Sequence, residues 1–133
     1  MIDDRNKELT EKIIGAAYQV ANTLGVGFLE KVYENALGHE LRKRGLRVEC
    51  QRPIGVYYDG IEVGCYVADL VVEGIVIVEL KNAQAIDDAH VAQCLNYLRA
   101  TGMSVGLLLN FGIAKIGVRR ILNTINSRND FHG

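Results

Sequence analysis

The stretch "YVADLVVEGIVIVELKN", residues 66–82, is almost wholly apolar, yet it carries charged side chains inside segments that read as core. Its β-branched residues predict two buried strands, and the glycine of Glu73-Gly74 suits the turn between them. Side chains alternate along a strand, so Glu79 and Lys81 point to the same side. Whether these three charged groups can form one site depends on which side of the sheet Asp69 points to.

The length of the turn sets the register of the two strands. A two-residue loop would pair Asp69 with Val78 and send its carboxylate to the face opposite Glu79. A three-residue loop over 72–74 would pair Asp69 with Ile77, and the carboxylate would lie diagonally across from Glu79, roughly 5–8 Å away. The one-residue difference tests the shared face, and in the three-residue loop Gly74 would supply the left-handed residue that such loops favour.

Two carboxylates at that separation repel each other unless a proton or a cation lies between them. Mg²⁺ or Mn²⁺ would fit Asp69 and Glu79, because hard divalent cations prefer oxygen ligands, and the backbone carbonyl of Leu80 is a further expected ligand. Lys81 would bring positive charge to a water molecule or to a phosphate. This set of groups favours phosphodiester hydrolysis.

A structural interpretation accounts for the same charges. The pattern Glu-x-Lys is common in strands, and a distant aspartate makes it only modestly rarer. Asp69, Glu79 and Lys81 would then form an ion-pair cluster near a sheet edge in a metal-free structural protein.

The rest of the chain predicts one α/β domain over residues 1–133, with a mixed β-sheet flanked by helices. Helical periodicity predicts helices over 8–23, about 28–44, 88–101 and 113–128. Strands are expected over 46–51, 54–58, 61–72, 75–82 and 105–112. Asp87-Asp88 is expected to cap the third helix, and Gly45 and Gly102 to end the second and third.

Composition narrows the classes of protein. The formal net charge of −1 leaves no broad basic field, although a local basic face is compatible with it. The apolar runs are too short to span a bilayer, and the charged N-terminal sequence has no signal-peptide core, so a cytoplasmic location is expected. The scattered Cys50, Cys65 and Cys94 lack zinc-ligand spacing and are expected to be free thiols.

The chain also resembles a known superfamily. Asp69 followed by "VELK", with Glu79 and Lys81, resembles the PD-(D/E)XK nuclease signature, although Ala68 replaces the usual proline. "GFLEKVY", with Gly27, Glu30 and Tyr33, resembles the motif of its GxxExxY family. The resemblance covers about residues 8–125.

The resemblance implies a restriction-endonuclease-like core and a Mg²⁺-dependent nuclease that cleaves DNA and leaves a 5′-phosphate. It makes Asp69 and Glu79 metal ligands and Lys81 the residue that orients or activates water. A nuclease-like fold with little turnover, used as a nucleic-acid-binding or assembly module, is the alternative.

Other residues are given supporting roles by the same resemblance. Glu30 would add a carboxylate to the metal shell, or else complement the dipole at the start of its helix. Gln93 and Tyr97 resemble a Gln-x-x-x-Tyr motif that positions DNA beside the metal. Tyr97 also fits an apolar helix stripe, whereas a buried glutamine amide needs hydrogen-bond partners.

Basic residues near the C-terminal end are candidates for phosphate contacts. Lys115, Arg119 and Arg120 fall in the predicted last helix, where Lys115 and Arg119 are four residues apart and could contact one phosphate strand. A solvated surface explains them equally well. A homodimer would double the footprint of so small a domain and match the two strands of a duplex.

Overall fold

A computed structural model describes residues 6–123 and shows a single α/β domain with a mixed five-stranded sheet and three helices. This confirms the predicted fold class. The helices are α1 (Lys7–Leu24), α2 (Glu30–Lys43) and α3 (Asp88–Thr101). The strands are β1 (Val48–Tyr58), β2 (Ile61–Val72), β3 (Val76–Lys81), β4 (Val105–Asn110) and β5 (Gly117–Leu122).

The sheet runs in the order β1-β2-β3-β4-β5, and only its β3–β4 pair is parallel. These two strands are joined by α3, the crossover that a parallel pair requires. Both are buried along nearly their whole length and consist mainly of Val, Ile and Leu, as expected for strands covered on both faces. The C-terminal ends of β3 and β4 therefore lie side by side, with Lys81 paired to Asn110.

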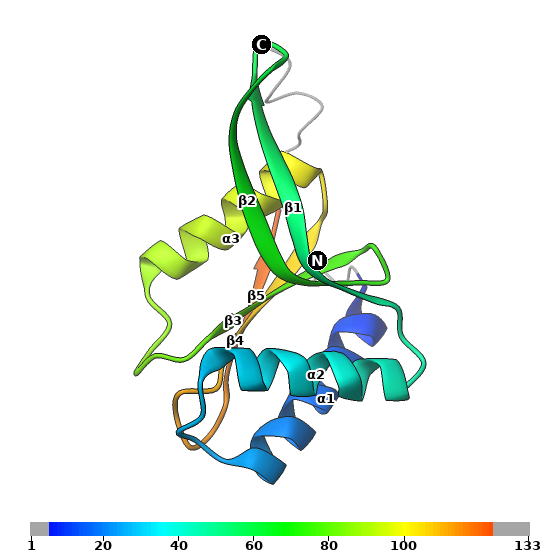
Figure 1. The fold of residues 1–133 in the computed structure, drawn as a ribbon, viewed down its shortest axis with the longest axis vertical. Coiled ribbons are helices and arrows are strands. Elements are labelled where there is room, and N and C mark those ends of the chain that lie inside the picture. The colour runs from blue at the N-terminus through cyan, green and yellow to red at the C-terminus, as the bar shows by residue number, and fades with distance from the viewer. Residues whose placement is uncertain (1–5, 124–133) are drawn as a thin grey trace.

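Helices cover both faces of the sheet (Figure 1). On one face, α1 and α2 bury a stripe that includes Ile13, Tyr33 and Leu37 against Val78 and Leu80. On the other face, α3 packs in a second cluster with the intervening β3 and β4 side chains. Side chains alternate along β3, so Val78 and Leu80 pack in the cluster with α1 and α2. Ile77 packs in the cluster with α3, and Glu79 lies on that same side of the sheet.

Local capping explains where the helices begin and end. Leu46 N–H donates to Leu41 and Gly45 N–H to Arg42, a Schellman motif in which Gly45 has φ 88°. The side chain of Asp87 accepts from His90 N–H at 2.9 Å, and the His90 side chain accepts from Asp87 N–H, so α3 starts with a capping box. The predicted stops at Gly45 and Gly102 and the predicted cap at Asp87 are confirmed.

The predicted C-terminal helix over 113–128 is wrong for residues 117–122, which form β5 antiparallel to β4; residues 124–128 of that helix lie outside the described residues. The cause is tertiary, because β4 is buried throughout and would otherwise present an unpaired apolar edge. Val118 and Leu122 pack on the α1 side, and Ile121 on the α3 side.

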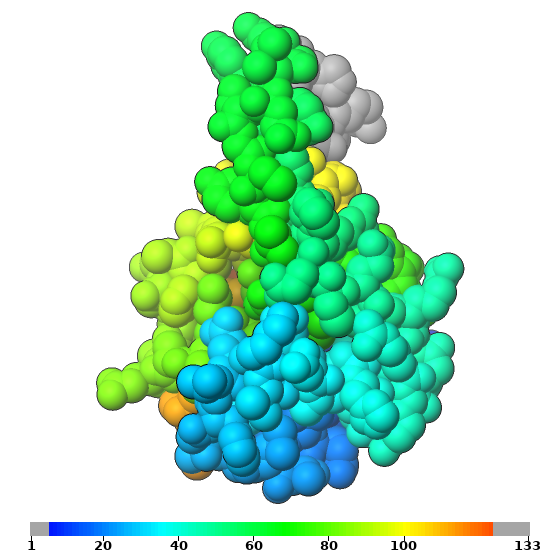
Figure 2. Space-filling view, viewed as in Figure 1, coloured from blue at the N-terminus to red at the C-terminus, as the bar shows by residue number. Residues whose placement is uncertain are grey.

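The two strands predicted over 46–51 and 54–58 are one long strand, β1. Gln51, the last residue of the first predicted strand, has φ 54°, a left-handed conformation that a non-glycine residue seldom adopts inside a strand. Beyond this kink β1 and β2 continue as a two-stranded hairpin that extends away from the body (Figures 1 and 2). We call residues 52–67 the arm.

Candidate active site

The β2–β3 turn has a different loop from either predicted one. Val72 pairs with Val76, so the loop is Glu73–Ile75, in which Glu73 and Gly74 have φ 56° and 66°. The three-residue length is right, but its position is shifted by one residue. Continuing this register sets Asp69 directly opposite Glu79 rather than diagonal to it.

The backbone ladder between β2 and β3 ends at Leu70–Val78, and side chains join the strands beyond it. Asp69 N–H donates to Glu79 Oε2 at 2.9 Å, and Leu80 N–H donates to Asp69 Oδ2 at 2.8 Å. Both carboxylates therefore lie in the opening between the separating strands. The N–H and C=O of a strand residue point the same way, so the Leu80 carbonyl faces this opening too.

Burial makes both carboxylates hard to ionise. Burial, followed by repulsion from Asp69, raises the pKa of the Glu79 carboxyl to about 8. Burial also raises the pKa of Asp69, and the charge of Glu34 adds to this, while the hydrogen bond from Leu80 opposes it. A cation bound between the two carboxyl groups would offset their repulsion and favour their ionised forms.

The α3 helix supplies the next neighbours. Lys81 Nζ lies 3.5 Å from Gln93 Oε1, a long contact from the end of β3 to an exposed α3 residue. Tyr97 is buried, and its ring lies 5.4 Å from that of Tyr66 on the arm. Burial, with the charges of Glu79 and Asp69, raises the pKa of Tyr97 to about 12, so its hydroxyl stays protonated at neutral pH. Gln93 therefore contacts Lys81, and Tyr97 lies close enough to Glu79 and Asp69 for their charges to act on its pKa.

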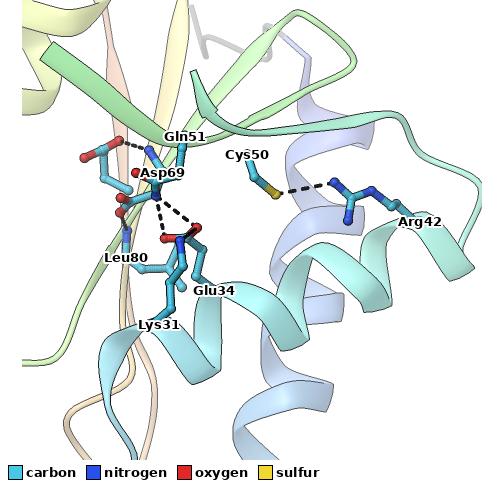
Figure 3. A network of polar contacts seen from close by, with 8 residues as sticks. Lys31, Glu34, Arg42, Cys50, Gln51, Asp69 and Leu80 are labelled. Carbon is cyan, nitrogen blue, oxygen red and sulfur yellow. Dashed lines mark hydrogen bonds and ion pairs between the residues drawn. The ribbon is translucent and has the colours of Figure 1, made fainter. Parts of the chain in front are cut away.

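Two further polar residues border the site and were missed from the sequence. Glu34 of α2 is only 3% exposed, and both of its carboxylate oxygens accept from Gln51 Nε2 at 2.9 Å (Figure 3). Lys31 Nζ donates to the same carboxylate at 2.9 Å. Gln51 also lies close enough to the Asp69 carboxyl to act on its pKa, which burial dominates. The signal that could have pointed to Glu34 is its place directly after Tyr33, an apolar-stripe residue of the predicted second helix.

Glu30 lies at the start of α2 and is close enough for repulsion from Asp69 to contribute, after burial, to a raised pKa. Within residues 6–123, however, no group of three or more His, Cys, Asp or Glu side chains is arranged to hold a metal ion. The expected third carboxylate is therefore not assembled with Asp69 and Glu79.

The three predicted basic residues do not form one helical face. Lys115 is exposed in the loop that follows β4, at the end of the sheet where Lys81 lies. Arg119 pairs with Leu108, on the α3 face, whereas Arg120 pairs with Leu107, on the α1 face. The predicted joint contact of Lys115 and Arg119 through helical spacing is wrong, and Arg120 points away from the carboxylates.

Asp69 and Glu79 bridge two diverging strands, and Lys81 lies two residues beyond Glu79. The family model described as the PD-(D/E)XK nuclease superfamily matches residues 7–121. The chain belongs to the PD-(D/E)XK nuclease superfamily. No curated protein and no solved structure gave a significant match. None of the helices within residues 6–123 of this superfamily member is long and apolar enough to cross a membrane.

Proposed function

We propose that this chain is a nuclease that hydrolyses DNA phosphodiester bonds with Mg²⁺ or Mn²⁺. The observation that carries the proposal is the meeting of the Asp69 and Glu79 carboxylates in the opening between β2 and β3. Membership of a nuclease superfamily supports the reaction class and an interaction with nucleic acid.

The residues in the opening fit a divalent cation. Asp69 and Glu79 offer carboxylate oxygens, and the Leu80 carbonyl offers a third oxygen from the same edge of β3. A cation held there would neutralise the two carboxylates and stabilise negative charge on the attacked phosphate. Glu30 is a more distant acid that could approach when the cation is bound.

Lys81 is the residue that we expect to contact the attacking water and the phosphate. Its ammonium group would orient the attacking water and offset charge on the phosphate, and the contact with Gln93 would limit where that group can lie. The water oxygen bonds to phosphorus as the phosphorus–O3′ bond breaks, and the proton goes to the leaving oxygen. The products are a 5′-phosphate and a 3′-hydroxyl. The protonated hydroxyl of Tyr97 is available to donate to the nucleic acid.

We propose phosphate contacts for Lys115 and Arg119, which lie at the end and on the face of the sheet that carry the site. Arg120 lies on the opposite, α1 face, so we do not propose a direct phosphate contact for it at this site. A homodimer would bring two sites to one duplex, one for each strand. The three cysteines are free, which fits a reducing cytoplasm.

We also propose that the chain belongs to the GxxExxY family, because two of the three motif residues have clear structural tasks. Gly27 has φ 108°, which favours glycine. The buried Tyr33 donates its hydroxyl to the Gly25 carbonyl at 2.6 Å and accepts from Phe28 N–H, closing the loop between α1 and α2. Glu30 is the motif residue nearest the carboxylates.

A panel of labelled nucleic acids incubated with Mn²⁺ tests the function. Wild type should cleave DNA, Lys81→Ala should lose roughly 10²–10³-fold in rate, as for a lost charge-stabilising donor, and chelation of the metal should stop the reaction. Comparing duplex, single-stranded and branched DNA with RNA identifies the substrate. Cleavage that survives Glu79→Gln would show that the activity comes from elsewhere. Binding without cleavage would favour the nucleic-acid-binding module instead.

A further inference from the structure

Tyr66 is a half-exposed aromatic side chain at the border of the site, and the proposed reaction gives it no task. Its ring centroid lies 5.4 Å from that of Tyr97 on α3, with 47° between the ring planes. Tyr97 is buried and lies close enough to Glu79 and Asp69 for their charges to act on its hydroxyl. Tyr66 is 50% exposed, so one ring links it to the carboxylates while part of its own ring faces solvent.

The strand register places Tyr66 on the face of the arm that meets α3. Tyr66 pairs with Ile54 and precedes Ala68 by two residues, and both of these side chains are buried in the cluster with α3. Tyr66 precedes Asp69 by three residues, which is at most roughly 10 Å along an extended strand. A stacked nucleic-acid strand covers this distance in about three nucleotides, at about 3.4 Å each. A strand whose phosphate lies at Asp69 can therefore place one of its next few bases over Tyr66.

The base of the arm forms one wall of the hollow that Figure 2 shows between the arm, α3 and the start of α2. This wall offers an aromatic face rather than positive charge. The arm carries one cation, Arg52, against two anions, and Arg52 pairs with Glu49 at 3.5 Å. Phosphate contacts depend on Lys and Arg, so they belong to the other walls, where Lys31 and Lys81 lie close enough to Asp69 to interact with its charge. An aromatic ring beside cationic groups is the arrangement with which proteins hold unpaired bases.

We propose that Tyr66 is a specificity-determining residue that stacks an unpaired base of the substrate strand within a few nucleotides of the attacked phosphate. In an intact duplex both faces of each base are covered by its neighbours, so only an unpaired nucleotide can offer a face to the ring. The contact with Tyr97 holds the Tyr66 ring in place before the substrate arrives, which reduces the entropy lost on stacking. The substrate class is therefore single-stranded DNA, or a duplex with an unpaired segment at the cut.

A tryptophan at position 66 reports the stacking directly, because the chain contains no tryptophan. The identity of the ligand rests on the proposed function, whereas contact with a base does not need the cleavage step. Tyr66→Trp is therefore titrated with single-stranded DNA without a divalent cation, and a base stacked on the indole should quench its fluorescence until the site is saturated. Tyr58→Trp is the matched control on the same arm, 71% exposed, and should not be quenched. An abasic strand of the same length, which has the phosphates without the bases, should quench neither variant.

Affinities for single-stranded and duplex DNA separate stacking from a structural role of the same side chain. Tyr66→Ala should weaken binding of single-stranded DNA by roughly 5- to 100-fold, as expected when a ring that stacks one base is lost, and should leave binding of duplex DNA unchanged. Tyr66→Phe keeps the ring and should bind both DNAs like wild type, and so should Tyr58→Ala. A structural role for Tyr66 would instead weaken binding of both DNAs by the same factor.

The outcomes distinguish the role of Tyr66 from the proposed nuclease. Unchanged affinities for Tyr66→Ala, equal losses for both DNAs, or equal quenching by the abasic strand would overturn the stacking and leave the nuclease standing. Single-strand binding that depends on Tyr66, without cleavage when Mn²⁺ is added, would support the stacking and contradict the nuclease. Wild type that binds no nucleic acid would overturn both.

Discussion

Asp69 and Glu79 are joined through backbone and side chain at the point where their strands separate. The Asp69 amide donates to the Glu79 carboxylate at 2.9 Å, and the Asp69 carboxylate accepts from Leu80, the residue after Glu79. Each acid is thus held by the strand of the other. Burial and the closeness of the two acids make it costly to ionise both of them.

The metal-free protein should become less stable as the pH rises from 5.5 to 8.5. The folded-state pKa of Glu79, about 8, lies above its ordinary value of 4.5. Between these values the folded chain holds a proton that the unfolded chain has released, so the free energy of unfolding falls with rising pH. The melting temperature should drop by several degrees, since each kcal/mol moves it by roughly 3–6 °C in a domain of this size.

Glu79→Gln is the control for that pH dependence. The amide keeps an oxygen for the Asp69 N–H but cannot ionise, so the melting temperature should depend much less on pH. Adding Mg²⁺ at pH 8.5 should raise the melting temperature of wild type and not that of the variant. A wild-type protein equally stable at both pH values would contradict the buried, repelling pair.

The kink at Gln51 predicts an unusual order of mutant stabilities. Gly adopts φ 54° freely, whereas a β-branched residue pays roughly 1–2 kcal/mol for a left-handed conformation. Urea unfolding should therefore find Gln51→Val less stable than Gln51→Gly by about that amount, the reverse of the usual preference in strands. Equal midpoints would mean that β1 is not kinked there.

Gln51 also has a side-chain role that the glycine variant isolates. Gln51→Gly keeps the backbone conformation but removes the amide that bonds both oxygens of Glu34. Glu34 would then move relative to Asp69, and we expect weaker Mn²⁺ binding, by roughly 10-fold or more, as for lost support of a metal ligand. Gln51→Asn, which tolerates the left-handed region but has a shorter reach, should fall between wild type and Gln51→Gly.

Asn110 should be important for stability. Its side chain is fully buried and makes hydrogen bonds to the backbone of Ala83 and Gly112, two to Ala83 and one to Gly112. Asn110→Ala should cost about 3 kcal/mol, at roughly 1 kcal/mol for each lost bond. Thermal unfolding measures this, and Asn82→Ala, which removes one exposed bond to Phe28, should cost much less.

The face assignments of the basic residues predict different effects on DNA binding. Arg119→Ala should weaken binding to duplex DNA and reduce the salt dependence by about one phosphate contact. Arg120→Gln should leave both unchanged, because Arg120 lies on the α1 face with Leu107. Fluorescence anisotropy at several salt concentrations compares them, and equal losses for the two variants would contradict the strand assignment.

Local patterns in the sequence were enough for α1, α2 and α3, for the strands on either side of Glu73-Gly74 and for the side shared by Glu79 and Lys81. Hydrophobic periodicity and capping residues act within a few positions of each other, so the ends of α2 and α3 were predictable. Alternation along β3 placed Glu79 and Lys81 on one side, whereas the place of Asp69 depended on the β2–β3 register, which was predicted one residue off.

The rest depends on tertiary contacts that periodicity does not report. Residues 117–122 satisfy helical and strand patterns in part, and the need to cover β4 decides between them. The kink at Gln51 and the approach of Glu34 come from packing between α2 and the hairpin. The one-residue shift of the β2–β3 loop follows from two successive left-handed residues, of which only Gly74 could be anticipated.

Calorimetric titration of the purified protein with Mn²⁺ at pH 8, without nucleic acid, is the most direct test of the cation site between β2 and β3. Wild type should bind Mn²⁺ with release of protons, because a carboxyl with a pKa near 8 must ionise to become a ligand. Asp69→Asn should lose that binding. Equal heats and equal proton release from wild type and Asp69→Asn would place the cation elsewhere and contradict the proposed site.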